Sequence, residues 1–338
     1  MTTNTIAIPT LAEMRETHAR IAPHVVRTPN ADWPGTAVSR LLGPAASVVM
    51  KLELFQRTGT FKARGAISVA LSLDPAVRAK GLTAASAGNH AIAVAWAAAK
   101  LGVPAKVVMQ ASANPFRIAL ARAEGANVIL KPPGKAVFDE AARIAREDGM
   151  ALVHPFEGPH TARGTATIGL ELLADVPDLD AVVVAIGGGG LASGLATAIK
   201  ALKPDCLVLG VEPSGADAMR RSFDAGHPVT LEKTDTIADS LAPPMTLPGG
   251  FATCRAGLDD LVTIDDDLIC AGLTLMQEDA KLAVEPAAGA AAAALFGPYR
   301  KRLAGRRVGL IVCGANIDSA SYGKLLARGA AAMPQLMN

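Results

Sequence analysis

Short runs of apolar and β-branched residues alternate with longer stretches of helical periodicity along most of the chain. The short runs predict strands at 47–52, 105–109, 128–130, 181–186, 207–211 and 307–312. The Ala-rich stretches between them predict helices at 92–101, 117–124, 137–147, 191–201 and 268–280. Strands that alternate with helices in this way form βαβ units, in which helices cover both faces of a parallel sheet. The pattern therefore predicts an α/β fold, with an irregular excursion at 234–257 where Pro and Gly are frequent.

The overall composition narrows the class of protein. The chain has 338 residues, which at about 150 residues per domain predicts two domains. Half of the residues are hydrophobic and 19% are charged, which supplies a large core and excludes a disordered chain. The formal net charge is +2, with basic and acidic residues interspersed. This distribution excludes a nucleic-acid-binding face and a basic membrane anchor.

Cysteine spacing and the N-terminal segment indicate the cellular location of the protein. Cys206, Cys254, Cys270 and Cys313 lie far apart, without the paired spacing of a zinc site, and are typical of reduced thiols in a core-rich chain. The N-terminal segment carries Glu and Arg where a secretory signal would be apolar. The longest run of small apolar residues, at 287–296, is too short to span a bilayer. We therefore expect a cytoplasmic protein with no membrane partner.

A run of four glycines lies between the predicted strand at 181–186 and the helix that follows: Gly187, Gly188, Gly189 and Gly190. Without Cβ atoms, consecutive backbone N–H groups can turn toward an anion, and the helix N-terminus adds its partial positive charge. The run lacks the spacing of a dinucleotide-binding fingerprint and the terminal Lys-Ser/Thr of a P-loop. A flexible turn is the alternative, but the position between a buried strand and a helix favours a phosphate-binding loop.

Two further segments carry reactive or polar side chains. Lys62 follows Phe61 where a loop enters a helix, and desolvation there would lower the pKa of its amine and make it a nucleophile; a solvated helix lysine is the alternative. Ser86, Asn89 and His90 lie between a strand and a helix, where short polar side chains and free amides suit a carboxylate or a ring hydroxyl. Ligands of open α/β sheets bind beyond the carboxyl ends of the strands, so these segments are expected to meet in one crevice.

Together these segments resemble the fold-type-II family of pyridoxal-5′-phosphate (PLP) enzymes, and within it the serine/threonine dehydratases and serine racemases. The motifs that carry the resemblance, in chain order, are Phe-Lys-Ala-Arg-Gly at 61–65, Ser-Ala-Gly-Asn-His at 86–90, the four glycines at 187–190, Glu-Pro-Ser-Gly-Ala at 212–216, Thr-Ile-Ala-Asp at 236–239, Glu-Pro at 285–286 and Cys-Gly-Ala-Asn at 313–316. The resemblance implies a tryptophan-synthase-β-like α/β fold with two parallel-sheet domains. Residues 1–71 and 157–338 would form a large PLP-binding domain and 72–156 a small substrate-side domain, with no C-terminal regulatory domain.

The resemblance also assigns roles to individual residues. Lys62 would bind PLP covalently and act as the catalytic base, Phe61 would pack near the cofactor ring, and Asn89 would hydrogen-bond the ring 3′-oxygen. The phosphate would be held by the amides of Gly187, Gly188, Gly189, Gly190 and Leu191. Cys313 would face the pyridine nitrogen, and Ser86, Asn89 and His90 would receive the substrate carboxylate.

The activity that the resemblance implies is elimination of the β-hydroxyl and then the amine from a small L-β-hydroxy-amino acid. L-threonine or L-serine would give a 2-oxo acid and ammonia in amino-acid catabolism, and a homodimer is expected. Another β-hydroxy-amino acid such as 3-hydroxyaspartate, and racemisation, remain alternatives. Racemases of this group carry a hydroxyl where this chain has Ala87, which favours elimination. A cysteine-synthase-like enzyme would carry Lys-Asp-Arg where this chain reads Lys62-Ala63-Arg64, and a dinucleotide-dependent oxidoreductase would carry the missing fingerprint.

A cation site is the feature of the resemblance that the residues support least. Many relatives hold a divalent cation with a Glu, an Ala carbonyl and an Asp. Glu212 and Ala216 match the first two ligands, but Ala218 replaces the final acid, so a Mg²⁺ or monovalent cation is in doubt unless Asp217 or water compensates.

Overall fold

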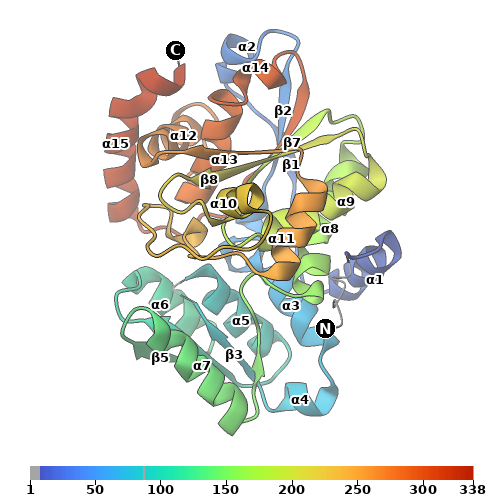
Figure 1. Cartoon of the computed structure of the whole chain (residues 1–338), viewed down its shortest axis with the longest axis vertical. Helices are drawn as coiled ribbons and strands as arrows, with labels where there is room; N and C mark the ends of the chain where they lie inside the picture. The colour runs from blue at the N-terminus through green and yellow to red at the C-terminus, as the bar shows by residue number, and fades with distance from the viewer. Residues whose placement is uncertain (1–7, 87, 338) are drawn as a thin grey trace.

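The computed structural model describes residues 8–86 and 88–337, whose strands form two separate sheets (Figure 1). The larger sheet has the strand order β1-β2-β10-β7-β8-β9. Its strands are β1 (Asn30–Asp32), β2 (Ser47–Lys51), β7 (Ala181–Ala185), β8 (Leu207–Pro213), β9 (Asp260–Ile264) and β10 (Arg307–Ile311). All neighbouring strands pair in parallel except β1, which pairs antiparallel with β2 at the edge.

The smaller sheet is wholly parallel and has the strand order β5-β4-β3-β6. Its strands are β3 (Leu82–Ala85), β4 (Ala105–Gln110), β5 (Asn127–Lys131) and β6 (Ala151–Leu152). With α5, α6 and α7 it forms the lower lobe in Figure 1. Those helices span Asn89–Lys100, Pro115–Ala123 and Lys135–Glu147.

The other helices cover the larger sheet or connect the two sheets. They are α1 (Leu11–Ile21), α2 (Ala37–Leu41), α3 (Lys62–Ser72), α4 (Pro75–Ala79), α8 (Pro159–Asp175), α9 (Gly190–Leu202), α10 (Ala218–Ala225), α11 (Pro248–Gly257), α12 (Asp266–Glu278), α13 (Pro286–Phe296), α14 (Arg300–Leu303) and α15 (Ser319–Met337). Three 3-10 turns, η1 (Glu53–Phe55), η2 (Arg57–Gly59) and η3 (Asp239–Leu241), complete the elements. None of the helices in this described part is long and apolar enough to cross a membrane.

Burial explains why the central strands are continuous apolar runs. Every residue of β7 is buried, because helices cover both faces of the sheet, and the strand reads Ala-Val-Val-Val-Ala. The Ala-rich helix α13 is buried along its whole length in the core of the larger sheet. Helix α3 contributes Ala66, Ile67 and Ala70 to the core of the smaller sheet while it also packs on α8. Lys62 therefore begins a helix that lies between the two sheets.

The predicted α/β class is confirmed, and the six predicted strands and five predicted helices are present to within a few residues. The helices α5, α6, α7, α9 and α12 begin one to three residues earlier than their apolar pattern predicts, because each begins with a polar residue, Gly or Pro. The strand expected before Ser86 is β3, but its range was not among the predicted runs, since Leu-Thr-Ala-Ala has a single β-branched residue, Thr83. The stretch at 234–257 is not wholly irregular, because Pro248 starts helix α11 there.

Candidate active site

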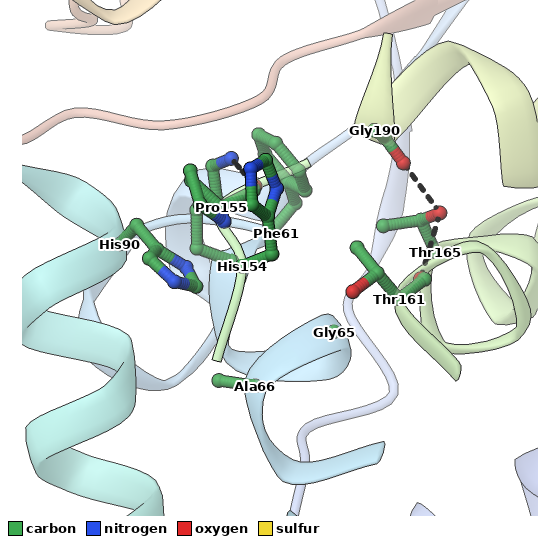
Figure 2. Close-up of a pocket in the computed structure, with 10 residues that line it drawn as sticks. Phe61, Gly65, Ala66, His90, His154, Pro155, Thr161, Thr165 and Gly190 are labelled. Carbon is green, nitrogen blue, oxygen red and sulfur yellow. Dashed lines mark hydrogen bonds between the residues drawn. The ribbon is translucent and has the colours of Figure 1, made fainter. Parts of the chain in front are cut away.

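A small cavity lies where α3 begins, between the two sheets (Figure 2). It is lined by Phe61, Lys62, Gly65, Ala66, His90, His154, Pro155, Thr161, Thr165 and Gly190. Lys62 Nζ donates a hydrogen bond to the Pro155 carbonyl at 2.5 Å. Burial lowers the pKa of the Lys62 amine to about 8, against the opposing influence of Glu285 and Cys313. The cavity thus contains an amine that is partly deprotonated near neutral pH, as a nucleophile requires.

A buried cluster of four charges anchors the start of α3 two residues beyond Lys62. The Arg64 guanidinium is fully buried and donates to both carboxylate oxygens of Glu53, at 2.8 and 2.9 Å, and to both of Glu171, each at 2.8 Å. Lys51 Nζ also donates to Glu171 at 2.8 Å. Two cations and two carboxylates satisfy one another, which is the condition for burying charge. The bidentate contacts fix the first turn of α3 and, with it, the backbone of Lys62.

Hydrogen bonds from three other segments hold the carbonyl groups of the glycine loop before α9. The Gly188 oxygen accepts from Thr246 Oγ1 at 3.3 Å, and the Gly190 oxygen accepts from Thr165 Oγ1 at 2.8 Å, as Figure 2 shows for the second. The Gly189 oxygen accepts from the Cys254 thiol at 3.7 Å. Since the C=O and the N–H of one trans peptide point in opposite directions, the amides of the next residues face the other way.

These inward amides belong to Gly189, Gly190 and Leu191, the last two of which lie in the first turn of α9, where N–H groups have no intrahelical partner. The loop therefore has the geometry of an anion-binding site.

Glycine is required in this loop for packing and backbone conformation. Gly189 has φ +98°, which favours glycine, and a Cβ on Gly188 would overlap the Phe156 ring. A Cβ on Gly190 would lie 2.7 Å from the Phe156 Cα. The segment that carries Phe156 is itself held by Glu157, whose carboxylate accepts the amides of Gly249 and Gly250 in the first turn of α11, at 2.7 and 2.9 Å.

The Ser86–His90 segment turns into α5 at the end of β3. Ser86 Oγ accepts the Gly88 N–H at 3.1 Å, and the His90 ring nitrogen Nε2 lies 2.8 Å from the Val153 carbonyl. A carbonyl only accepts, so Nε2 carries the proton and the ring is neutral; burial lowers the His90 pKa to about 3. His90 therefore has its backbone N–H, at the start of α5, to offer a carboxylate. Ala87 lies outside the described residues.

His154, which sequence reasoning missed, lines the same cavity. Its Nδ1 accepts the amides of Phe156 and Glu157 at 3.3 and 3.0 Å, so this ring carries its proton on Nε2. Burial lowers its pKa to about 4, with Lys62 acting in the same direction. Both imidazoles at the cavity are thus uncharged at neutral pH.

Asn89 lies in a hydrogen-bonded group that joins the two sheets. Asn89 Nδ2 donates to the buried carboxylate of Glu285 at 2.8 Å, and Asn89 Oδ1 accepts from Asn316 Nδ2 at 2.9 Å. Cys313 follows β10 and is buried, and burial raises the pKa of its thiol, as does Glu285. The thiol is therefore neutral where the sequence predicts the partner of a pyridine nitrogen.

Arg117 of α6, a second residue that sequence reasoning missed, spans the same junction. Its guanidinium pairs with Asp239 and lies 3.8 Å from Glu285, and its Nε donates to the Asn316 carbonyl at 2.9 Å. Its side chain also lies against the Ser86–His90 segment, because a Cβ on Gly88 would be 2.8 Å from Arg117 Cδ. Only the fold could reveal this residue, since its partners lie more than a hundred positions away in the sequence.

The residues at this cavity fit the cofactor that the sequence predicts. Phe61, Lys62, His90 and Gly190 line one cavity, and the remaining glycines and Leu191 belong to the same loop. The loop offers inward amides for a phosphate, and Lys62 offers an amine of lowered pKa for an aldehyde. The individual roles assigned to Phe61, Asn89, Cys313 and the glycines stay predictions.

The predicted cation site does not fit a cation. The Glu212 carboxylate is fully buried and accepts the amides of Met219 and Arg220 at 3.0 and 2.8 Å, so it caps helix α10. Asp217 forms an ion pair with Arg221 at 2.9 Å and does not compensate for Ala218. Among the described residues, no group of three or more His, Cys, Asp or Glu side chains could hold a metal ion. We derive no step through a metal.

This arrangement predicts that a divalent cation does not stabilise the protein. After dialysis against a chelator, the protein should keep its melting temperature, with or without millimolar Mg²⁺. Ala218→Asp should lower the melting temperature by placing a second carboxylate beside Glu212, and Mg²⁺ should then restore it. A rise of the wild-type melting temperature on adding Mg²⁺ would contradict this assignment.

Comparison with known proteins places this geometry in context. The family model described as "Pyridoxal-phosphate dependent enzyme" matches residues 21–314. The chain is 47% identical over 332 residues to a phenylserine dehydratase of Ralstonia pickettii, which covers 96% of this chain and 99% of that protein. A solved maize serine racemase is similar with a TM-score of 0.88 at 34% identity, covering 96% of this chain and 99% of the other. A solved threonine deaminase of Solanum lycopersicum gives a TM-score of 0.86 at 30% identity, covering 95% and 94%.

Proposed function

Since the chain belongs to the pyridoxal-phosphate-dependent enzymes, we propose that it removes water and then ammonia from an L-β-hydroxy-amino acid with an uncharged side chain. The class includes L-serine, L-threonine and L-3-phenylserine. The Lys62 amine of lowered pKa, which lines one cavity together with Gly190 of the glycine loop, is the observation that carries the proposal. The product is the 2-oxo acid in which hydrogen replaces the β-hydroxyl of the substrate.

Different residues of the chain would bind the cofactor and transfer the proton in this reaction. PLP, when bound, supplies the electron sink that makes the substrate Cα proton acidic. Lys62 Nζ takes that proton, and the inward amides of Gly189, Gly190 and Leu191 hold the phosphate. The neutral Cys313 thiol adds no negative charge, which supports prompt loss of a β-leaving group over transamination. The proton that Lys62 takes from Cα balances the one that the β-hydroxyl gains as it leaves as water, and a second water hydrolyses the released enamine to the 2-oxo acid and ammonia.

The charge balance at the junction supports an uncharged substrate side chain. Arg117 is the guanidinium that lies against the Ser86–His90 segment, and its charge is already balanced by Asp239 and Glu285. A substrate with a second carboxylate, such as 3-hydroxyaspartate, would bring a further negative charge beside these two acids without a free partner. The apolar side chains of Phe61, Ala66 and Pro155 line the cavity instead.

A substrate panel assayed for 2-oxo acid and ammonia tests the proposal. We expect kcat/KM for the best of L-serine, L-threonine and L-3-phenylserine to exceed that for L-threo-3-hydroxyaspartate at least about tenfold. Asp239→Asn, which leaves Arg117 less neutralised, should narrow this gap. Preference for hydroxyaspartate by the wild-type enzyme would overturn the uncharged class.

The same reactions distinguish elimination from racemisation. Ala87 has no hydroxyl to deliver a proton to the face opposite Lys62, so we expect much less D-isomer than 2-oxo acid from L-serine. More D-serine than pyruvate would make the chain a racemase. The resemblance also predicts a homodimer, which light scattering of the holoenzyme would test.

A further inference from the structure

Asn316, in the Cys-Gly-Ala-Asn motif after β10, is buried at the point where three segments of the site meet. Its side-chain Nδ2 donates to the Thr58 carbonyl at 2.8 Å and to Asn89 Oδ1 at 2.9 Å. Its own carbonyl accepts from Arg117 Nε at 2.9 Å. The two hydrogens of one amide group therefore join the turn before Lys62 to the start of α5.

These contacts allow only one orientation of the Asn89 amide. Glu285 Oε2 accepts from Asn89 Nδ2 at 2.8 Å, and Asn316 Nδ2 donates to Asn89 Oδ1. Rotating the Asn89 amide by half a turn would set oxygen against the Glu285 carboxylate and N–H against N–H of Asn316. Asn89 thus uses its oxygen and one N–H within the protein, and the second N–H is the group it can offer a ligand.

The turn on the other side of Asn316 has an unusual backbone. Thr58 has φ +65°, a left-handed conformation that β-branched residues rarely adopt, and Gly59 has φ +72°. A Cβ on Gly59 would lie 2.6 Å from Asn316 Oδ1, so the turn approaches the amide as closely as glycine permits. Phe61 and Lys62 follow Gly59 by two and three residues. The strained turn is held in part by the hydrogen bond from Asn316.

We propose that Asn316 is a positioning residue: it fixes the amide of Asn89 so that a side-chain N–H, and not the oxygen, faces the 3′-oxygen of the cofactor, and it sets the turn before Lys62 against that amide. This inference rests on the proposed function, because it assumes the PLP site that Lys62 and Asn89 share. It adds a residue that would touch neither cofactor nor substrate.

The substitution Asn316→Asp tests the inference, because it keeps the shape of the side chain and replaces its two N–H donors by an acceptor. The new carboxylate would repel Asn89 Oδ1, while Glu285 would still attract Asn89 Nδ2, so we expect the Asn89 amide to lose its single favoured orientation. PLP affinity, measured by titrating the dialysed protein, should fall about tenfold or more. The pH midpoint of the visible absorbance of the bound cofactor should rise by about one unit, since an anionic oxygen would lose a donor.

Asn114→Asp is the matched control. Asn114 Nδ2 also donates across the same junction, to Asp318 Oδ2 at 2.6 Å, and an aspartate there would still cap α6. It makes the same chemical change without reaching Asn89. We expect it to lower the melting temperature to a similar degree and to leave the absorbance midpoint and PLP affinity unchanged.

A double-mutant cycle shows whether Asn316 acts through Asn89. In Asn89→Ala, the further change Asn316→Asp should have much less effect on PLP affinity than it has in the wild type. Additive effects, or an unchanged absorbance midpoint in Asn316→Asp, would overturn the inference. Asn316→Ser, which is smaller and uncharged, replaces Asn316→Asp in the cycle if the aspartate variant does not fold. The proposed function is tested first, on the wild-type protein. If the wild-type protein binds no PLP through Lys62, the proposed function itself is refuted.

Discussion

Lys62→Ala should abolish turnover and the visible absorbance of the covalently bound cofactor while the protein stays folded. Lys62 is the first residue of α3, and its side chain lines the cavity. The amine is expected both to bind PLP and to take the Cα proton, so no other group replaces it. We expect kcat/KM to fall at least about 10³-fold. Reduction of the wild-type holoenzyme with borohydride, followed by peptide mass spectrometry, should find the cofactor on the peptide that contains Lys62.

A lysine elsewhere on the small sheet provides the control for that substitution. Lys106 pairs with Asp148 at 2.8 Å on the surface, where an ion pair contributes little, so Lys106→Ala should keep activity and absorbance. A Lys62→Ala protein that retains the covalent absorbance would show that another amine binds PLP.

The pH dependence of cofactor capture tests the environment of Lys62. Burial lowers the Lys62 pKa to about 8, so a larger fraction of the amine is deprotonated at neutral pH than for an exposed lysine. The rate at which apoprotein captures PLP should therefore rise with pH and level off above about pH 8. A rate that continues to rise toward pH 10 would indicate an ordinary lysine pKa.

Sequence periodicity predicted the central strands well because strands buried on both faces are continuous runs of apolar residues. β7, with Val182, Val183 and Val184, cannot carry polar residues on either face. The sequence of β3 gives a weaker strand signal, since its small residues are equally frequent in helices. The fold-type-II class, by contrast, was predicted from motif order and is confirmed by the family match and by the solved relatives.

The candidate site was predictable where one short segment carries its chemistry, and not where the chemistry depends on distant partners. Lys62 and the glycine loop could be found because a nucleophile and an anion-binding turn are each local patterns. Arg117 and Asn316 became interpretable only once the structure joined them to Asp239 and Asn89. No local pattern distinguishes Arg117 from an ordinary helix residue, and the Cys-Gly-Ala-Asn motif that ends in Asn316 does not reveal which residues Asn316 contacts.

The supports of the glycine loop illustrate the same limit. Thr165, Thr246 and Cys254 come from three separate segments, and together they hold the loop carbonyls by hydrogen bonds. In the sequence they are two ordinary threonines and one of four cysteines. Their shared role follows from the orientation of the peptide groups.

Gly188→Asp should weaken PLP binding more than about a hundredfold. The new carboxylate would lie in the loop whose amides are expected to hold the phosphate, and like charges in close contact cost several kcal/mol. The Cβ alone would also overlap the Phe156 ring, so the ring would have to move. Dialysis followed by titration with PLP measures the loss, and melting curves establish that the variant folds.

Two comparisons separate the charge from the steric effect. Gly188→Ala adds only the Cβ, so combining it with Phe156→Leu should restore much of its lost PLP affinity, whereas Phe156→Leu should not rescue Gly188→Asp. Pyridoxal has the same aldehyde but no phosphate, so Gly188→Asp should weaken pyridoxal capture far less than PLP capture. Equal losses for both ligands would mean that the glycine loop shapes the cavity without binding the phosphate, and the anion would then have to be held by the amides at the start of α5.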